Sequence, residues 1–235
     1  MKKIKIADEV FANLYTLDNM NKIVLYCHGF GESKESVEKH VDILNKNNIG
    51  VISFDFPSHG EEKIDYQKLD CTNSLKYVDM VYNYLKDNYD IPICLMGSSY
   101  GGYISLGYIN YYHKKFDKVF LKYPAVNFYE NLENKMNFRE DYFDNHDYFL
   151  HEITGYKLYK ECFFDYKNHD IRINFNKFDN NIFIIHGSLD NTVYLDDVKS
   201  FANKYNIKLY VVDGGHHGLK ENLDLVNEKM IDFFK

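Results

Sequence analysis

Short apolar runs that alternate with helical patterns constrain the fold of this 235-residue chain more than any other feature. Each run is almost continuously apolar and is followed by a turn and then by a helical pattern. Continuous apolar strands between helices are typical of a parallel sheet that is covered on both faces. The expected strands are residues 22–27, 50–56, 91–96, 118–123, 182–185 and 207–212, and residues 4–15 add one or two edge strands.

The helices and one long interruption complete this pattern. We expect helices at residues 36–47, 73–88, 100–112, 195–205 and 219–234, the last two with apolar residues at helical spacing. Residues 127–179 show no clear strand and are too long for a simple connection, so we expect them to form a helical lid. The sequence therefore predicts an α/β fold, a mostly parallel central sheet flanked by helices, with residues 1–126 and 180–235 as its core.

Charge and cysteine usage limit the partners and the compartment. The net charge is −7 and no basic run is present, so the chain lacks the contacts that nucleic acids and anionic membranes require. Residues 1–20 hold no apolar stretch long enough for a signal peptide, and no later segment reaches membrane-spanning length. The four cysteines show no paired spacing, so we expect free thiols and a cytoplasmic protein.

A Gly-x-Ser-x-Gly motif at residues 97–101 joins one expected strand to a helix. A tight turn of this kind lifts a serine hydroxyl out of the backbone and aims the first amides of the helix at a developing negative charge. Glycines stand two residues either side of Ser99, whereas Ser98 has Met96 at the corresponding preceding position. Ser99 is therefore the candidate nucleophile, and an ordinary glycine turn is the alternative interpretation.

Candidate partners for Ser99 follow two later strands, at the carboxyl edge where ligands gather in parallel sheets. Asp190 lies after the strand at 182–185 and would accept the Nδ1 proton of a histidine, unless it only caps a turn or helix. His217 precedes the last helix and would act as general base and then as general acid, with His216 as a structural neighbour. The chain order serine, aspartate, histidine is that of α/β hydrolases and differs from those of chymotrypsin and subtilisin.

Backbone amides would complete such a site. A tetrahedral intermediate needs two donors about 3 Å from its oxyanion, and the amides of Phe30 and Tyr100 are the candidates. His28 is expected to order its turn, and Asp55 and His59 to pin the loop at residues 55–60 beside the site. The other histidines show no metal-ligand spacing and no H-E-x-x-H motif is present, so no metal is predicted.

These segments resemble the α/β-hydrolase superfamily over nearly the whole chain. The most similar members are small bacterial serine hydrolases that include feruloyl and cinnamoyl esterases and monoacylglycerol-lipase-like enzymes. The resemblance is carried by residues 28–30, 55–60, 97–102, 186–193 and 214–219, and by the insertion between the sixth and seventh strands. It implies a triad of Ser99, Asp190 and His217, an oxyanion hole formed by the Phe30 and Tyr100 amides, a covalent acyl-enzyme and no cofactor. Pro57 and Ser58 depart from the usual loop sequence, which weakens the assignment to a subfamily.

The leading functional interpretation is a carboxylesterase that acts on a small-molecule ester. Lid aromatics would form a pocket for aryl or medium-chain acyl groups, unless they only pack the lid against the core. These residues are Tyr142, Phe143, Tyr148, Phe149, Tyr156, Tyr159, Phe163 and Phe164. A peptidase or amidase of the prolyl-oligopeptidase type, a thioesterase or an acyltransferase would use the same triad. A non-catalytic binding protein on this scaffold is the remaining alternative, and the sequence leaves a homodimer open.

Overall fold

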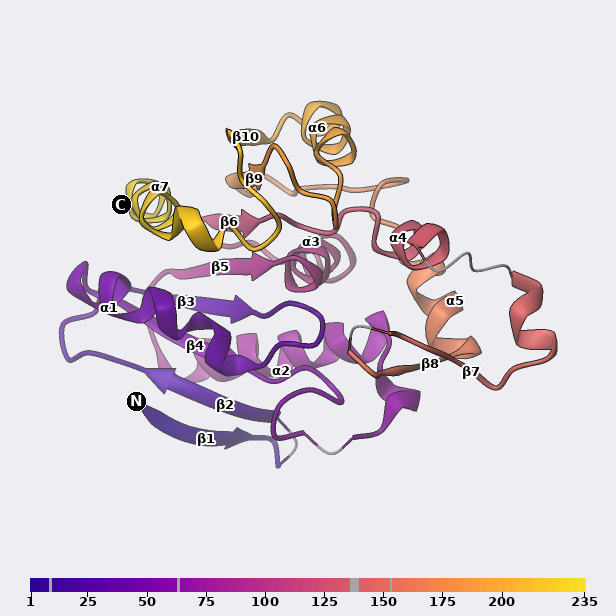
Figure 1. Ribbon diagram of the computed structural model, residues 1–235. Coiled ribbons are helices and arrows are strands. Elements are labelled where there is room, and N and C mark those ends of the chain that lie inside the picture. Colours follow the sequence, from indigo (N-terminus) through magenta and orange to yellow (C-terminus); the bar gives the residue numbers. More distant parts are fainter. Residues whose placement is uncertain (9, 63, 136–139, 153) are drawn as a thin grey trace.

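An eight-stranded, mostly parallel sheet forms the centre of the protein in the computed structural model, which describes residues 1–8, 10–62, 64–135, 140–152 and 154–235 (Figure 1). The strand order is β1-β2-β4-β3-β5-β6-β9-β10. The strands are β1 (Lys2–Ile6), β2 (Val10–Tyr15), β3 (Lys22–Cys27), β4 (Ile49–Phe54), β5 (Ile93–Ser98), β6 (Val119–Lys122), β9 (Ile182–Gly187) and β10 (Lys208–Val212). Strands β1 and β2 are antiparallel and lie at one edge, whereas the other six run parallel.

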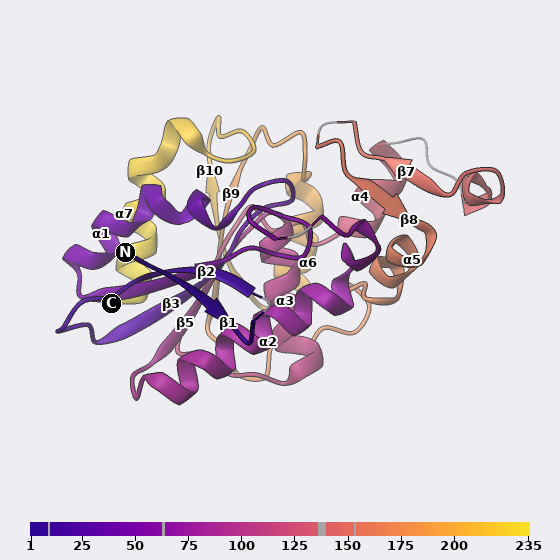
Figure 2. The ribbon, with the colours of Figure 1, turned by 90° about the horizontal axis from the view of Figure 1, so that it is seen from below.

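Helices cover both faces of this sheet (Figure 2). One face carries α1 (Glu38–Lys46) and α7 (Leu223–Phe234), which bury apolar residues against β3, β4 and β6. The other carries α2 (Cys71–Asn88), α3 (Tyr100–Tyr112) and α6 (Leu195–Lys204), over a larger apolar cluster. Short 3-10 turns occur at η1 (Lys34–Val37), η2 (Tyr66–Lys68) and η4 (Lys220–Asn222). The predicted α/β architecture is thereby confirmed.

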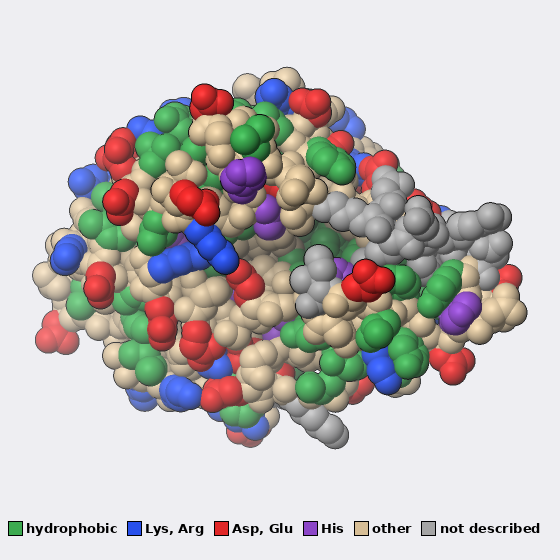
Figure 3. Space-filling model, in the orientation of Figure 1, with side chains coloured by type: hydrophobic (Ala, Val, Ile, Leu, Met, Phe, Trp, Pro, Cys, Tyr) green, Lys and Arg blue, Asp and Glu red, His purple; other side chains and the backbone are tan. Residues whose placement is uncertain are grey.

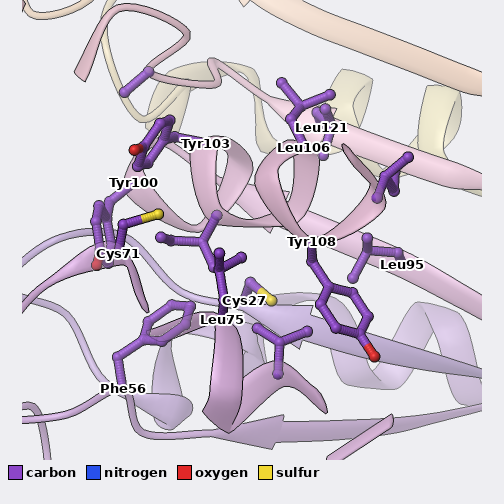
Figure 4. Close-up of a cluster of buried hydrophobic side chains, with 14 of the residues drawn as sticks. Cys27, Phe56, Cys71, Leu75, Leu95, Tyr100, Tyr103, Leu106, Tyr108 and Leu121 are labelled. Carbon is purple, nitrogen blue, oxygen red and sulfur yellow. The ribbon is translucent and has the colours of Figure 1, made fainter. Parts of the chain in front are cut away.

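Helix α3 is buried on nearly every side because it lies between the sheet and α2 (Figure 4). Its tyrosines use their hydroxyl groups inside this core. Tyr100 bonds Ser74 at 2.7 Å and Tyr166 at 3.1 Å, and Tyr108 donates to Asp79 at 2.7 Å. A buried hydroxyl needs such partners, so the Tyr100 bonds fix the start of α3 and the Tyr108 bond fixes its second half.

Residues 127–179 differ from the expected helical lid. The segment contains α4 (Phe128–Lys135), η3 (Glu140–Asp144) and α5 (Lys160–Asn168), together with an antiparallel hairpin of β7 (Tyr148–Leu150) and β8 (Lys157–Tyr159). The expectation that it holds no strand is therefore wrong. The ring contact between Tyr148 and Tyr159 and the Lys157 amine over the Tyr148 ring support the pairing. Residues 136–139 and 153 of the segment lie outside the described residues.

The insertion lies beyond the carboxyl ends of the parallel strands (Figure 1). It is attached to the core through α5, where the Asp165 carboxylate accepts bonds from the Thr72 amide at 2.9 Å and hydroxyl at 2.7 Å. Phe163 and Tyr166 are buried in the core cluster. All four cysteines are buried free thiols, as expected, and no helix among the described residues is long and apolar enough to cross a bilayer.

Candidate active site

Ser99 occupies the turn between β5 and α3 and has a strained backbone, with φ at +51°. The flanking glycines are required by close contacts. A Cβ on Gly97 would lie 2.6 Å from the carbonyl oxygen of Gly101, and one on Gly101 would lie 2.1 Å from that of Cys27. The Ser99 amide donates to the carbonyl oxygen of Lys122 at 3.0 Å, which ties the turn to β6. Helix, sheet and turn therefore present the serine hydroxyl at the carboxyl edge.

Ser99, His217 and Asp190 lie together in a hydrogen-bonded series. His217 Nε2 is 3.1 Å from Ser99 Oγ, and His217 Nδ1 is 2.7 Å from Asp190 Oδ2. The other oxygen of Asp190 accepts the amides of Thr192 at 2.8 Å and Val193 at 2.9 Å. Burial favours the neutral acid, but the bonds from His217 and these amides lower the pKa of Asp190 below its ordinary value. The carboxylate thus stays ionised and keeps the His217 proton on Nδ1.

Two further side chains pack around the series. The ring of Tyr123 meets the His217 ring edge-on at 4.8 Å. His186 of β9 is fully buried, with Nε2 3.0 Å from the Val193 carbonyl oxygen and 3.4 Å from Asp190 Oδ2. Burial lowers the pKa of His186, so it adds no charge beside Asp190. His216 is exposed, which agrees with the preference for its neighbour.

The two candidate oxyanion residues come from different segments of the chain. Tyr100 is the first residue of α3, and Phe30 lies in the loop after β3. The amide next to Phe30, that of Gly31, donates to His59 Nε2 at 3.0 Å. In the reverse direction, the Phe56 amide donates to His28 Nε2 at 3.1 Å. Two hydrogen bonds therefore join the loop after β3 to the loop after β4, and in each bond a histidine of one loop accepts an amide of the other.

The hydrogen bonds of His28 and His59 determine which ring nitrogen of each carries the proton. Each ring has Nδ1 within 2.9 Å of a carbonyl oxygen on its own loop, so Nδ1 carries the proton and Nε2 is the acceptor. Burial lowers the pKa of His28 to about 4 and that of His59 to about 3. His28 orders its turn, as the sequence predicts, and His59 additionally holds the candidate oxyanion loop.

A buried ion pair supports the same loops. Asp55 is fully buried and accepts the Lys34 amide at 2.8 Å, the Lys34 amine at 2.6 Å and the Glu61 amide at 2.9 Å. Burial opposes the charge on Lys34, but its bonds to Asp55 and Glu61 raise the pKa of the amine. Asp55 therefore pins the loop as expected. Sequence reasoning missed Lys34, because a lone lysine in a loop gives no signal of burial.

A cavity of about 650 Å³ opens over Ser99 and His217, between the core and the insertion (Figure 3). Its apolar wall consists of Phe30, Ala125, Phe128, Leu132, Phe149 and Val193, and its polar positions are Asn131, His151, Glu152, Thr154 and Thr192. Sequence reasoning did not identify these polar residues, which reach the site only through the fold. Of the lid aromatics singled out from the sequence, Phe149 lines the cavity, whereas Phe143 and Phe163 are buried in the core cluster.

One cluster of metal-ligating types lies away from this cavity. Within the described residues, Cys71, Asp165 and His169 have ligand atoms within 4.8 Å of one another. Both oxygens of Asp165 already bond Thr72, and burial raises the pKa of the Cys71 thiol well above its ordinary value. A protonated thiol is a poor ligand, so the cluster fits packing between α2 and α5 better than metal binding.

Comparison with known proteins relates this geometry to a family. Residues 18–146 match the model of the family described as serine aminopeptidase, S33. A putative monoglyceride lipase of Schizosaccharomyces pombe is 35% identical over 89 residues, which are 36% of this chain and 24% of the lipase. The matched region thus spans about a quarter of that relative.

Solved structures share the whole fold. Est1E of Butyrivibrio proteoclasticus with bound ferulic acid has a TM-score of 0.83 at 18% identity, and the match covers 100% of this chain and 99% of the Est1E chain. A putative hydrolase of Agrobacterium vitis S4 has a TM-score of 0.82 at 17% identity, covering 100% and 98%. The esterase EaEST of Exiguobacterium antarcticum has a TM-score of 0.73 at 16% identity, covering 98% of each chain. At these identities the likeness shows the α/β-hydrolase fold.

Proposed function

The chain belongs to the serine aminopeptidase, S33, family and is an α/β hydrolase, and on this premise we propose that it cleaves carboxylic esters with Ser99 as nucleophile. The observation that supports this most is the continuous series from Ser99 Oγ through the His217 ring to Asp190, with spacings of 3.1 and 2.7 Å. A serine hydroxyl becomes a useful nucleophile when an imidazole of fixed tautomer can take its proton.

The proposed reaction uses each group in turn. His217 Nε2 takes the Ser99 proton as the oxygen attacks the ester carbonyl carbon, while Asp190 stabilises the imidazolium. The amides of Phe30 and Tyr100 donate to the oxyanion of the tetrahedral intermediate. The imidazolium then protonates the departing alcohol oxygen, which leaves the acyl group on Ser99. A water molecule, deprotonated by His217, then attacks the acyl carbon. The bond from this carbon to Ser99 Oγ breaks, the imidazolium returns its proton to Oγ, and the acid is released.

The cavity supports an ester with an aryl or medium-chain acyl group as substrate. Its volume of about 650 Å³ and its wall of Phe30, Phe128, Leu132 and Phe149 favour an apolar group. Est1E binds ferulic acid, an aromatic acid, in the structure with the same fold. A panel of nitrophenyl and hydroxycinnamate esters tests this. A uniform preference for acetyl over every bulky acyl group would contradict it.

An aminopeptidase is the second candidate, and Glu152 favours it. This exposed glutamate lines the cavity, where its carboxylate would pair with the amino group of an aminoacyl substrate. The two candidates differ in their response to Glu152→Gln. We expect this change to reduce hydrolysis of aminoacyl nitroanilides and to leave neutral nitrophenyl esters unaffected. Faster turnover of aminoacyl substrates than of every ester would favour the peptidase.

A fluorophosphonate probe tests the nucleophile directly. We expect labelling of the wild type and none of Ser99→Ala. Ser98→Ala is the matched control, because Ser98 is buried next to Ser99 but bonds the Tyr26 hydroxyl at 3.0 Å. Asp190→Asn should label far more slowly, since the histidine loses its fixed tautomer. Labelling that survives in Ser99→Ala would exclude Ser99, and an unlabelled, folded wild type would favour a binding protein.

A further inference from the structure

A second, smaller cavity of about 100 Å³ lies behind the candidate triad, on the face covered by α1 and α7. Its lining residues are Lys39, His40, Lys122, Gly218, Leu219, Lys220, Leu223 and Val226. Three of these are lysines and one is a histidine, while no acidic residue is among them. Such a lining attracts small negative ions.

Lys122 is the residue on which this cavity depends. It ends β6, is only 1% exposed, and has its amine 2.7 Å from His40 Nε2. His40 Nδ1 lies 2.6 Å from the side-chain oxygen of Asn227, so Nδ1 carries the proton and Nε2 accepts from Lys122. In its charged form the Lys122 amine has three N–H donors, and this bond occupies one of them. The lysine therefore has donor capacity left for an anion.

The positive charges of the cavity lack close carboxylates. Within the described part of the chain, Lys39, Lys122 and Lys220 have no carboxylate at ion-pair distance. Glu32 acts on both Lys122 and Lys39 from further away, and its carboxylate accepts the Gly29 amide at 3.0 Å. Burial, together with repulsion from Lys39, lowers the pKa of Lys122 well below its ordinary value. An anion bound beside the amine would favour its charged form and offset the repulsion from Lys39.

We propose that this cavity is a binding site for a small anion, of the size of a halide or a short carboxylate, held by Lys122 with Lys39 and Lys220 at its mouth. The volume of about 100 Å³ admits such an ion and excludes a sugar acid. Leu219, Leu223 and Val226 form the rest of the wall, so the ion sits against apolar surface where the attraction of a lysine is weakly screened. This site is independent of the proposed esterase activity.

The site adjoins the backbone of both proposed catalytic residues. The carbonyl oxygen of Lys122 accepts the Ser99 amide at 3.0 Å. Gly218 and Leu219, which line the cavity, directly follow His217 and have φ of +89° and +49°. An ion bound here therefore stabilises the turn that carries His217 and the strand end that holds Ser99.

Thermal unfolding in matched salts tests the proposal. Sodium bromide and sodium acetate are compared with sodium gluconate at equal ionic strength, because gluconate is too large for the cavity. We expect bromide and acetate to raise the Tm of the wild type in a saturable way. At ten times the dissociation constant the rise should be about 3 to 6 °C. Crystals soaked in bromide should show an anomalous peak at hydrogen-bond distance from Lys122 Nζ.

Variants locate the effect. The rise in Tm with bromide or acetate should be lost in Lys122→Met and, separately, in the double variant Lys39→Gln with Lys220→Gln. It should remain in Lys86→Gln, which changes an exposed lysine of α2. The double variant changes only the exposed lysines at the mouth of the cavity, so it can still be measured if Lys122→Met does not fold. Equal Tm values in all three salts would overturn the proposal. A rise in Tm that remains in Lys122→Met and in the double variant would also overturn it, as would bromide peaks confined to exposed lysines elsewhere.

Discussion

Replacing His59 with alanine tests how the candidate oxyanion loop is held. The His59 ring accepts the Gly31 amide at 3.0 Å, and it packs against the ring of Phe30 at 5.5 Å and the ring of Tyr156, which belongs to the insertion, at 5.0 Å. The variant removes the acceptor and leaves the Gly31 amide without its partner. The neighbouring Phe30 amide, which we propose as an oxyanion donor, then loses its fixed orientation.

The expected magnitude follows from these contacts. An orphaned buried amide costs about 1 to 3 kcal/mol, and the cavity left by the ring adds to this, so unfolding should become easier by about 2 to 4 kcal/mol. Loss of a whole oxyanion donor lowers kcat by about 10²–10³. Since His59 positions a donor and is not one itself, we expect kcat to fall about tenfold to a hundredfold, with little change in KM.

Turnover of a nitrophenyl ester gives kcat and KM, and a boronic acid that mimics the tetrahedral intermediate reports the oxyanion site directly. Boronate affinity should fall together with kcat. His59→Gln, whose amide oxygen can accept the Gly31 amide, should recover part of both, and His146→Ala, at an exposed histidine, should change neither. A folded His59→Ala with unchanged kcat and unchanged boronate affinity would refute the positioning argument.

Two further outcomes concern stability. Gly101→Ala should destabilise the fold by about 3 kcal/mol or prevent folding, because its Cβ would lie 2.1 Å from a carbonyl oxygen of β3. Gly107→Ala in the same helix has its nearest neighbour at 3.4 Å and should stabilise by about 0.5 to 1 kcal/mol, so equal urea midpoints for the two variants would contradict the contact. The free energy of unfolding should also decrease as the pH is lowered from about 6.5 to about 3. In the folded protein the pKa values of His28 and His59 are lowered to about 4 and 3, so between these limits the unfolded chain binds more protons than the folded one. Each group contributes up to about 1.4 kcal/mol per pH unit, and His59→Gln should flatten the slope measured by urea unfolding between these limits.

The boundaries of the elements were predictable where a sharp local signal marks them. Strand β3 and helix α3 have the predicted limits, because a turn follows the first and the Gly-x-Ser-x-Gly motif starts the second. Helix α7 begins at Leu223 instead of residue 219, because Leu219 adopts a positive φ and residues 220–222 form a 3-10 turn. The hairpin of β7 and β8 was not predicted, because strands of three residues are too short to show an alternating pattern.

The candidate site was also predictable only in part. Ser99, Asp190 and His217 were brought together in the prediction because each follows a strand of a parallel sheet, and such ends share one edge. Lys34 and Thr154 had no such signal. Lys34 is buried only because the Asp55 carboxylate lies opposite it, and the place of Thr154 depends on how the insertion folds back over the core. Both depend on contacts between distant segments, which residue type and spacing do not encode.

The candidate triad and part of the cavity wall belong to different parts of the chain. The candidate triad lies on loops of the sheet, whereas Phe149 and Thr154 of the insertion close the cavity above it. One place where the two parts meet is Gly31, where a Cβ would lie 2.5 Å from a methyl group of Thr154. On its other side the Gly31 amide is bonded to His59, which belongs to the core. This hydrogen bond holds the loop from the core side, and from the insertion side the rings of His151 and Tyr156 pack against Phe30. Changes in the insertion can therefore alter which substrate fits while the core keeps the oxyanion loop in place.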